Sequence, residues 1–235
     1  MNAIEQPHKP EATFHVLRHA HGGTTHFFET QYVDEQFHDI GDPPLSSLGE
    51  EQCRNLRESL SEGKDAHYIL LSPMLRARQT VQTVFHHPFS RKPPIKSIIW
   101  DSLRDCPPKD NKYKFCYKSG AKLPVMQEEL QGKFDLSLVR ADWHKNFAHM
   151  NMQAARADGV RSELYKLAEI VIQGGLWNEI RFERYTGTGN VHITIVSHNN
   201  FLNFLTHRDK LPGKFSTSYS ENLLLTQGRK THPAR

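Results

Sequence analysis

The sequence predicts an α/β fold, specifically a three-layer α/β/α sandwich with a mostly parallel central sheet and an inserted lid region. Short apolar runs alternate along the chain with segments whose apolar residues recur at helical spacing, a pattern typical of successive βα units. The length of 235 residues suits one such domain and is enough to bury a large core.

The first strand is predicted over Phe14 to Leu17, and a basic pair follows it directly. Arg18 and His19 fall where this strand would reach the carboxyl edge of a sheet, the usual place for ligands in open α/β folds. Gly22 and Gly23 then allow a sharp turn and a close approach to a bound group. Arginine offers a fork that matches phosphate oxygens, and histidine is a nucleophile or proton carrier. The alternative is a solvated basic turn.

A long connection, Thr24 to Asp42, leads to the first predicted helix, which ends at Leu60. Aromatic residues in this connection either line a pocket or fasten it to the core. Ser47 and Glu50 form a capping box at the start of the helix. We interpret this segment as a structural cap without chemistry. The residues predicted to face the core are Leu48, Cys53, Leu56 and Leu60.

The second strand, His67 to Leu71, leads into a helix with Ser72 as N-cap and Pro73 at the first helical position. Arg76 lies in the first turn, at the positive end of this helix, where a cation is disfavoured. We therefore expect an anion to compensate Arg76; a surface salt bridge is the alternative. The predicted buried face consists of Met74, Ala77, Val81 and Phe85.

The third strand, Ile95 to Trp100, ends in the acidic segment Asp101 to Asp105. From about 106 to 149 the pattern gives way to prolines, lysines and aromatic residues. We interpret this region as a basic, aromatic lid over the edge of the sheet, with a solvated loop as the alternative.

The last third of the chain repeats the opening theme. A long helix is predicted over Gln153 to Gln173, and a turn over Gly187 to Asn190. The apolar strand Val191 to Val196 then delivers His198 to its carboxyl end, and a helix follows from Phe201. A last edge-type strand is predicted over Asn222 to Thr226.

Residues 1–12 are expected to form a loose arm, 13–226 a single domain and 227–235 a flexible basic tail.

Composition and charge limit the partners. A net charge of +4 falls short of the basic stripe of nucleic-acid binders and suits small anionic molecules. Three irregularly spaced cysteines favour a reducing compartment. No run approaches membrane-spanning length. We expect a cytoplasmic monomer or homodimer that binds neither membrane nor nucleic acid.

Four strand ends thus carry candidate chemistry. In a parallel sheet the carboxyl ends of the strands lie along one edge, so distant segments can build one site. The predicted set consists of Arg18, His19, Arg76, Asp105 and His198. Two imidazoles, two guanidinium groups and one carboxylate suit phosphoryl transfer through a covalent phosphohistidine.

These segments resemble the signatures of the histidine phosphatase (phosphoglycerate mutase-like) superfamily and, within it, the fungal mutase-like branch. Leu17-Arg18-His19-Ala20-His21-Gly22 resembles the branch's variant of L-R-H-G. Asp42 through Gln52 resembles D-P-P-L-T-x-x-G-x-x-Q. Ser72 through Thr80 resembles S-P-L-x-R-A-x-Q-T, and Val196-Ser197-His198 resembles V-S-H-G. Four signatures in the right order make a specific match.

The resemblance implies roles for these residues. His19 is the implied nucleophile, and Arg18, Arg76 and His198 hold the phosphoryl oxygens. Asp105 is the implied proton donor and stands where the family has glutamate. Because aspartate is shorter by one methylene, Asp101 and Asp110 are alternative donors. The other expected contacts to phosphate are Gly22, Thr25, which stands where the branch has asparagine, and Asn199, which replaces a glycine. No metal or other cofactor is implied.

The predicted function is hydrolysis of a small phosphorylated metabolite through phospho-His19, with mutase activity less favoured. The alternative keeps the fold but uses His19, His198 and Asp105 as general acid and base on an unphosphorylated metabolite, as a lyase, isomerase or cyclase of a fungal biosynthetic pathway. A metal enzyme is disfavoured, because no carboxylate or cysteine lies at ligand spacing beside the paired histidines. A binding protein without catalysis is the remaining alternative, and a nucleic-acid anchor in the basic tail is less favoured still.

Overall fold

The computed structural model describes residues 9–22, 41–60, 66–85, 95–105, 120–145, 153–206 and, for the backbone alone, 214–216. The predicted strand over Asn222 to Thr226, the terminal tail and most of the connection from Thr24 to Asp42 lie outside these residues.

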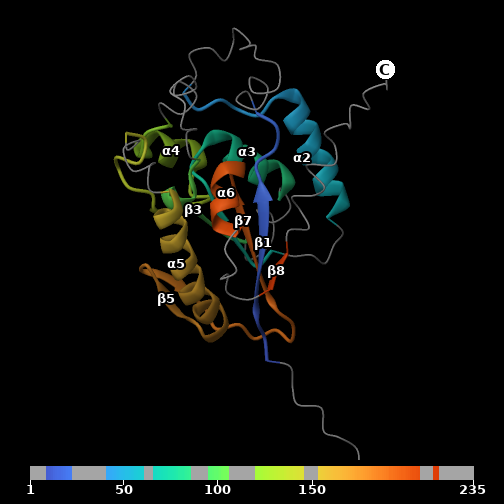
Figure 1. Ribbon diagram of the computed structural model, residues 1–235, viewed down its shortest axis with the longest axis vertical. Coiled ribbons are helices and arrows are strands. Elements are labelled where there is room, and N and C mark those ends of the chain that lie inside the picture. The colour runs from blue at the N-terminus through green and yellow to red at the C-terminus, as the bar shows by residue number, and fades with distance from the viewer. Residues whose placement is uncertain are drawn as a thin grey trace, which may run out of the picture.

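A parallel sheet forms the centre of the molecule (Figure 1). Its strand order is β4-β3-β2-β7-β1-β8, and every pairing in it is parallel. The strands are β1 (Ala12–Arg18), β2 (Tyr68–Leu71), β3 (Lys96–Trp100), β4 (Asp135–Leu138), β7 (Val191–Ser197) and β8 (Lys214–Ser216). The first three predicted strands and the strand before His198 are therefore confirmed.

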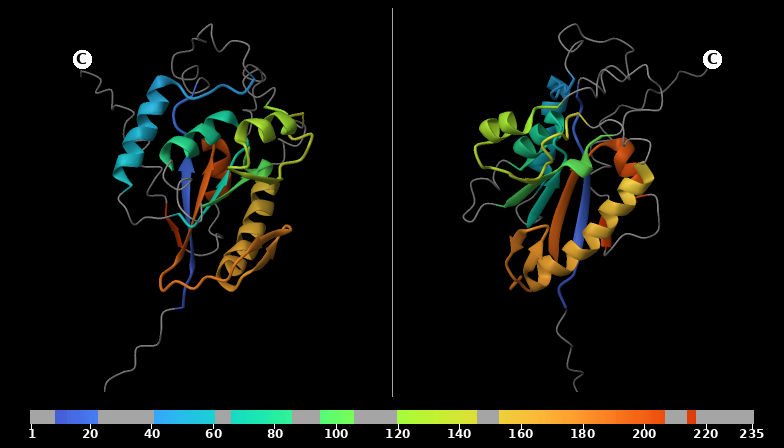
Figure 2. Two further views of the ribbon diagram at one scale, coloured as in Figure 1. Left: turned by 180° about the vertical axis from the view of Figure 1, so that it is seen from behind. Right: turned by 90° about the vertical axis from the view of Figure 1, so that its left-hand side faces the viewer.

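Helices cover both faces of the sheet, as the two views of Figure 2 show. One face carries α2 (Ser47–Ser59), α3 (Leu75–Val84) and α4 (Leu123–Leu130), and the other carries α5 (Gln153–Gln173) and α6 (Asn199–Thr206). A short 3-10 turn, η3 (Asp101–Leu103), follows β3. The predicted three-layer α/β/α fold is confirmed, and α5 has the bounds predicted from its periodicity.

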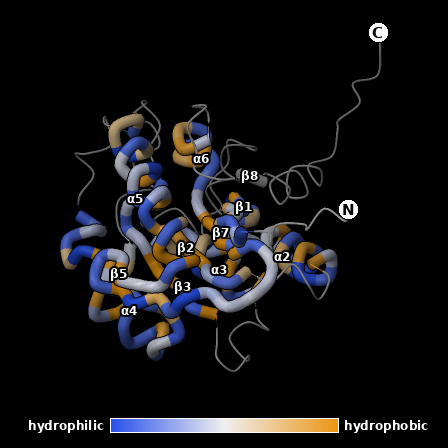
Figure 3. Tube along the Cα trace, turned by 90° about the horizontal axis from the view of Figure 1, so that it is seen from below, coloured by the Kyte–Doolittle hydropathy of each residue, from blue (hydrophilic) through white to orange (hydrophobic). Residues whose placement is uncertain are grey.

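Each face of the sheet has its own apolar core, and apolar residues gather between the layers in Figure 3. Alternate residues of β1 belong to different cores: Phe14 and Val16 pack toward α5 and α6, whereas Leu17 packs toward α2 and α3. Successive side chains of a strand point to opposite faces, so a strand between two helical layers must be apolar on both sides. This is why the strands appear in the sequence as continuous apolar runs.

Part of the region predicted as a lid belongs to the sheet and its helices instead. Within 106–149 the structure describes residues 120–145, where α4 packs into one core and β4 pairs with β3. The sequence pattern missed both elements because each is short. It also missed the antiparallel hairpin of β5 (Gly175–Trp177) and β6 (Ile180–Phe182). Leu48, predicted to face the core, is exposed.

Candidate active site

Strand register brings the predicted residues to one edge of the sheet. Arg18 pairs with Ser197 across β1 and β7, and Leu71 pairs with Val196 across β2 and β7. The pairing continues one residue beyond the strands, because the His19 amide donates to the Ser197 carbonyl at 2.9 Å. The rings of His19 and His198 consequently lie with centroids 4.8 Å apart.

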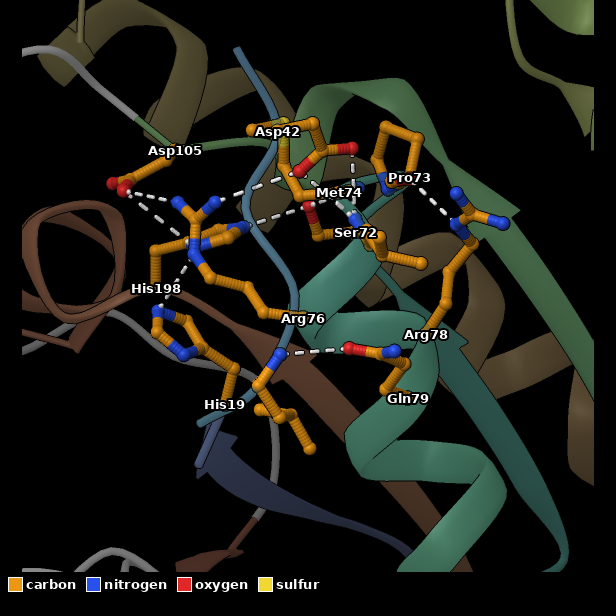
Figure 4. Close-up of polar contacts among 12 residues, drawn as sticks. His19, Asp42, Ser72, Pro73, Met74, Arg76, Arg78, Gln79, Asp105 and His198 are labelled. Atoms are coloured by element: carbon orange, nitrogen blue, oxygen red, sulfur yellow. Dashed lines mark hydrogen bonds and ion pairs between the residues drawn. The ribbon is translucent and has the colours of Figure 1, made fainter. Parts of the chain in front are cut away.

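Arg76 is the centre of this cluster (Figure 4) and is fully buried. Its Nε donates to Nε2 of His19 at 3.2 Å, and its Nη2 donates to Oδ2 of Asp105 at 2.9 Å. Its Nη1 lies 3.6 Å from Oδ1 of Asp42. The anion expected to compensate Arg76 is therefore supplied by two carboxylates of the protein itself. The alternative of a surface salt bridge is wrong, because the side chain has no exposure to solvent.

His19 is held as a neutral imidazole with a defined lone pair. Its Nδ1 lies 2.7 Å from the carbonyl oxygen of Ala20, which can only accept, so the ring proton is on Nδ1. Burial lowers the pKa of His19 well below its usual value, and the guanidinium of Arg76 lowers it further. Nε2 therefore carries a lone pair at neutral pH and faces Arg76, as a nucleophile for phosphorus requires.

His198 is also buried and neutral. Burial lowers the pKa of His198 well below the usual value, and the positive charge of Arg76 lowers this pKa further. Its Nε2 lies 2.8 Å from the Ser72 hydroxyl, and its Nδ1 lies 3.6 Å from Oδ2 of Asp105. The imidazole thus connects the end of β2 with the acidic segment that follows β3.

Asp105 is placed at the site by the segment that carries it. The Ser197 hydroxyl donates to the Leu103 carbonyl at 2.6 Å, and Arg156 donates to the Arg104 carbonyl at 3.0 Å. Asp101, one alternative donor, instead accepts from Nε of Arg140 at 2.7 Å, and among the described residues it makes no hydrogen bond with the imidazoles or Arg76. Asp110, the other alternative, lies outside the described residues.

Asp42 is a site residue that the sequence analysis missed. Both of its carboxylate oxygens accept from the amide of Leu75, at 3.0 and 2.9 Å, so it caps α3 from a distant segment. Burial raises the pKa of Asp42 to about 6, although Arg76 acts in the opposite direction. The predicted N-cap Ser72 is thus wrong: α3 begins at Leu75, and its own N-cap residue makes no side-chain bond. The D-P-P signature was the available signal.

The segment around the start of α2 fixes the turn that follows His19. The His21 backbone amide donates to Oε1 of Gln52 at 2.8 Å. Nδ1 of the His21 imidazole lies 2.6 Å from the Ser46 hydroxyl. A Cβ at Gly49 would lie 1.9 Å from the His21 carbonyl oxygen, so only glycine fits there. Ser46, and not the predicted Ser47, caps the helix by accepting from the Gly49 amide. The segment therefore builds the site, and its interpretation as a cap without chemistry was too narrow.

Besides Arg76, helix α3 contributes polar side chains that hold the backbone around the site. The Thr80 hydroxyl accepts from the Ala20 amide at 3.0 Å, and Oε1 of Gln79 accepts from the Leu45 amide at 2.8 Å. Arg78 points away from the site toward Pro73 (Figure 4), and its Nη1 donates to Oε2 of Glu129 at 3.1 Å. The S-P-x-x-R-A-x-Q-T spacing therefore places one arginine in the site and uses the polar residues after it to hold the backbone.

The remaining predicted residues take different positions. Arg18 is half-buried at the end of β1, where its charge lowers the pKa of both His19 and His198. Gly22 is buried against the Arg76 side chain. A Cβ at this position would lie 3.3 Å from Cδ of Arg76, which is a tight contact. Asn199 begins α6 and is exposed, and Thr25 lies outside the described residues.

Arg156, near the start of α5, is a second residue that the sequence did not indicate. Its guanidinium carbon lies 4.5 Å from the ring centre of Phe201, and its charge contributes to lowering the pKa of His198. It therefore adds to the positive potential around the two imidazoles.

The described part of the chain was found to hold neither a metal-ligand cluster nor a membrane-spanning helix. No group of three or more histidine, cysteine, aspartate or glutamate side chains there is arranged to hold a metal ion. No helix there combines the length and apolar character needed to cross a membrane.

Comparison with known proteins gives one sequence match and several distant structures. No curated protein matches the chain. A putative α-ribazole-5'-phosphate phosphatase from Escherichia coli is 17% identical, covering 84% of this chain and 79% of its own, with a TM-score of 0.46. The ecdysone phosphate phosphatase of Bombix mori, solved with tungstate, is 18% identical, covering 85% and 81%, with a TM-score of 0.47. A mycobacterial glucosyl-3-phosphoglycerate phosphatase is 17% identical, covering 81% and 76%, with a TM-score of 0.45.

At these identities and TM-scores, the substrates of those enzymes say nothing about the substrate of this chain. The family model of the histidine phosphatase superfamily (branch 1), in contrast, matches residues 15–107, which include His19, Asp42, Arg76 and Asp105. Over these residues the chain is similar to the histidine phosphatase superfamily.

Proposed function

We propose that this protein hydrolyses the phosphate monoester of a small metabolite through a phosphohistidine formed on His19. The observation that carries the proposal is the setting of the His19 imidazole. Its Nδ1 proton is held by the Ala20 carbonyl, so the Nε2 lone pair faces Arg76 at 3.2 Å, beside a second neutral imidazole. A nucleophile, anion-binding groups and a nearby carboxylate are thus present in one buried cluster.

The first step transfers the phosphoryl group to the protein. An incoming phosphate competes for the Arg76 guanidinium, whose Nε and Nη2 are held by His19 and Asp105 without substrate. Nε2 of His19 then attacks phosphorus, and the bond from phosphorus to the ester oxygen breaks. Asp105, released from Arg76 and protonated, gives its proton to the leaving oxygen. Arg18, Arg76 and His198 offset the charge on the phosphoryl oxygens.

The second step reverses the role of the carboxylate. Asp105 takes a proton from water, whose oxygen attacks phosphorus, and the bond from phosphorus to Nε2 of His19 breaks. The products are inorganic phosphate and His19 with its lone pair restored. Asp105 regains the proton that it gave in the first step, so the cycle balances.

The test is trapping by a rapid alkaline, denaturing quench with an aryl phosphate labelled on phosphorus, because a phosphohistidine survives alkali and is lost in acid. We expect release of phosphate and a labelled, acid-labile protein, and we expect His19→Ala to remove the label and lower turnover by at least about 10³-fold. His67→Ala, the same change just before the amino end of β2, is the matched control and should keep the activity. A wild-type protein with neither label nor turnover, and whose melting temperature phosphate and vanadate do not raise, would overturn the proposal.

A second candidate is acid–base catalysis on an unphosphorylated metabolite by His19, His198 and Asp105. The observation that favours it is the pair of carboxylates, Asp105 and Asp42, already beside Arg76 at 2.9 and 3.6 Å. Two negative charges there oppose the binding of a dianionic phosphate. The failure of all three phosphate readouts above is the result that this candidate predicts. A cytoplasmic protein acting as a monomer or homodimer on an anionic metabolite remains our expectation for its setting.

A further inference from the structure

Ser72 touches the second imidazole of the site from a fully buried position. It follows β2 directly, and its amide donates to the Val196 carbonyl at 3.0 Å, which fixes it beside β7. Its hydroxyl oxygen lies 2.8 Å from Nε2 of His198 and accepts weakly from the Met74 amide at 3.3 Å. Figure 4 shows Ser72 and His198 with Arg76.

The protons around this hydroxyl can be accounted for. A serine hydroxyl has one proton to donate and two lone pairs to accept with. The Met74 amide uses one lone pair. If Nε2 of His198 carried a proton, it would use the other, and the hydroxyl proton would need a further acceptor. In the described part of the chain, the Ser72 hydroxyl has no such acceptor. The hydroxyl proton therefore goes to Nε2, which must be a lone pair.

This choice fixes the other nitrogen of the ring. A neutral imidazole has one proton, so Nδ1 carries it when Nε2 accepts. Nδ1 is buried and makes no hydrogen bond among the described residues, and it lies 3.6 Å from Oδ2 of Asp105, the oxygen that also accepts from Arg76. The N–H thus lies beside the cluster around the guanidinium and makes no hydrogen bond to a described residue.

We propose that Ser72 is a positioning residue that holds His198 in its Nδ1–H form, so that His198 presents a proton donor to an oxygen of the substrate while His19 presents a lone pair. The tautomer follows from the contacts of Ser72 alone, whereas the use of the donor in catalysis rests on the proposed phosphatase function. Serine at this position thereby gives two identical side chains, His19 and His198, complementary tasks.

The direct test is long-range nitrogen–proton NMR of the histidine side chains in the intact protein near neutral pH. We expect His198 to show the Nδ1–H pattern in the wild type, and a mixed or Nε2–H pattern in Ser72→Ala. His19 is an internal reference and should stay Nδ1–H in both proteins, because the Ala20 carbonyl holds it. An Nε2–H pattern for wild-type His198, or no change in Ser72→Ala, would overturn the proposal.

A kinetic test addresses the catalytic consequence. Ser72→Ala should lower kcat toward an aryl phosphate by about 10- to 100-fold, with a smaller change in KM, because the donor acts mainly on the transition state. Ser72→Thr keeps the hydroxyl and should restore most of kcat, and Ser137→Ala, at an exposed serine, should leave it unchanged. Unchanged kcat in an active Ser72→Ala protein would overturn the catalytic part.

The NMR and kinetic results separate the two proposals. Wild-type His198 in the Nδ1–H form in a protein without phosphatase activity would contradict the proposed function only. An active phosphatase with His198 in the Nε2–H form would contradict the role of Ser72 only. If Ser72→Ala fails to fold, the wild-type spectrum alone decides which nitrogen of His198 carries the proton.

Discussion

The substitution Asp42→Asn should change how the stability of this protein depends on pH. Asp42 is buried between the amide of Leu75 and the guanidinium of Arg76. Burial raises its pKa from 3.8 to about 6. Asparagine has nearly the same shape and keeps one oxygen for the Leu75 amide, but it cannot ionise. The variant therefore resembles the protonated form of Asp42 at every pH.

The sign follows from the direction of the shift. A carboxyl group whose pKa is raised on folding binds its proton more tightly in the folded state, so its contribution to stability is complete below pH 3.8 and is lost as the pH rises through about 6. The shift corresponds to about 3 kcal/mol across the whole range. Between about pH 5 and about pH 7.5 the wild type should lose roughly 1 to 1.5 kcal/mol relative to Asp42→Asn.

The assay is urea unfolding of both proteins across this pH range, with the difference in unfolding free energy plotted against pH. Taking the difference cancels the depressed pKa values of His19 and His198, which reduce the stability of both proteins as the pH falls below about 6.5. Asp142→Asn makes the same change at an exposed carboxyl group and should give a much flatter difference. A flat difference for Asp42→Asn, or one of opposite slope, would refute the account of Asp42 as a buried carboxyl group.

Two further predictions use pairs of matched substitutions. Gly49→Ala places a Cβ 1.9 Å from the backbone oxygen of His21 and should displace the turn after His19, which lowers both stability and activity. Gly159 lies in α5, and a Cβ there would meet nothing within 4 Å. Gly159→Ala should therefore stabilise the protein by about 0.5 to 1 kcal/mol. Thermal unfolding compares the two, and equal effects would contradict the described packing. Arg76→Lys loses the planar fork and should lower kcat/KM toward an aryl phosphate by about 100-fold. Arg78→Lys, two residues on in the same helix, should change kcat/KM by less than about threefold; a similar loss in both variants would mean that Arg76 acts only through stability.

Local pattern was sufficient to predict the main elements of this fold. The apolar runs that became β1, β2, β3 and β7 are buried on both faces, so hydrophobicity along the chain marks them directly. The periodicity of α5 gave its bounds, from Gln153 to Gln173. The parallel arrangement then implied that the histidines after β1 and β7 would meet, and their rings lie 4.8 Å apart.

Contacts between distant segments decided the rest. Asp42 caps a helix that begins 33 residues later, and the two carboxylates beside Arg76 come from segments on opposite sides of it in sequence. The strand β4 is recognisable only by its pairing with β3, because its own residues are half-exposed. Which nitrogen of each imidazole carries the proton depends on the acceptor or donor that the fold places beside it. Sequence patterns indicate which residues are buried. A hydrogen bond, in contrast, needs a donor and an acceptor about 3 Å apart, and only folding brings distant segments that close together.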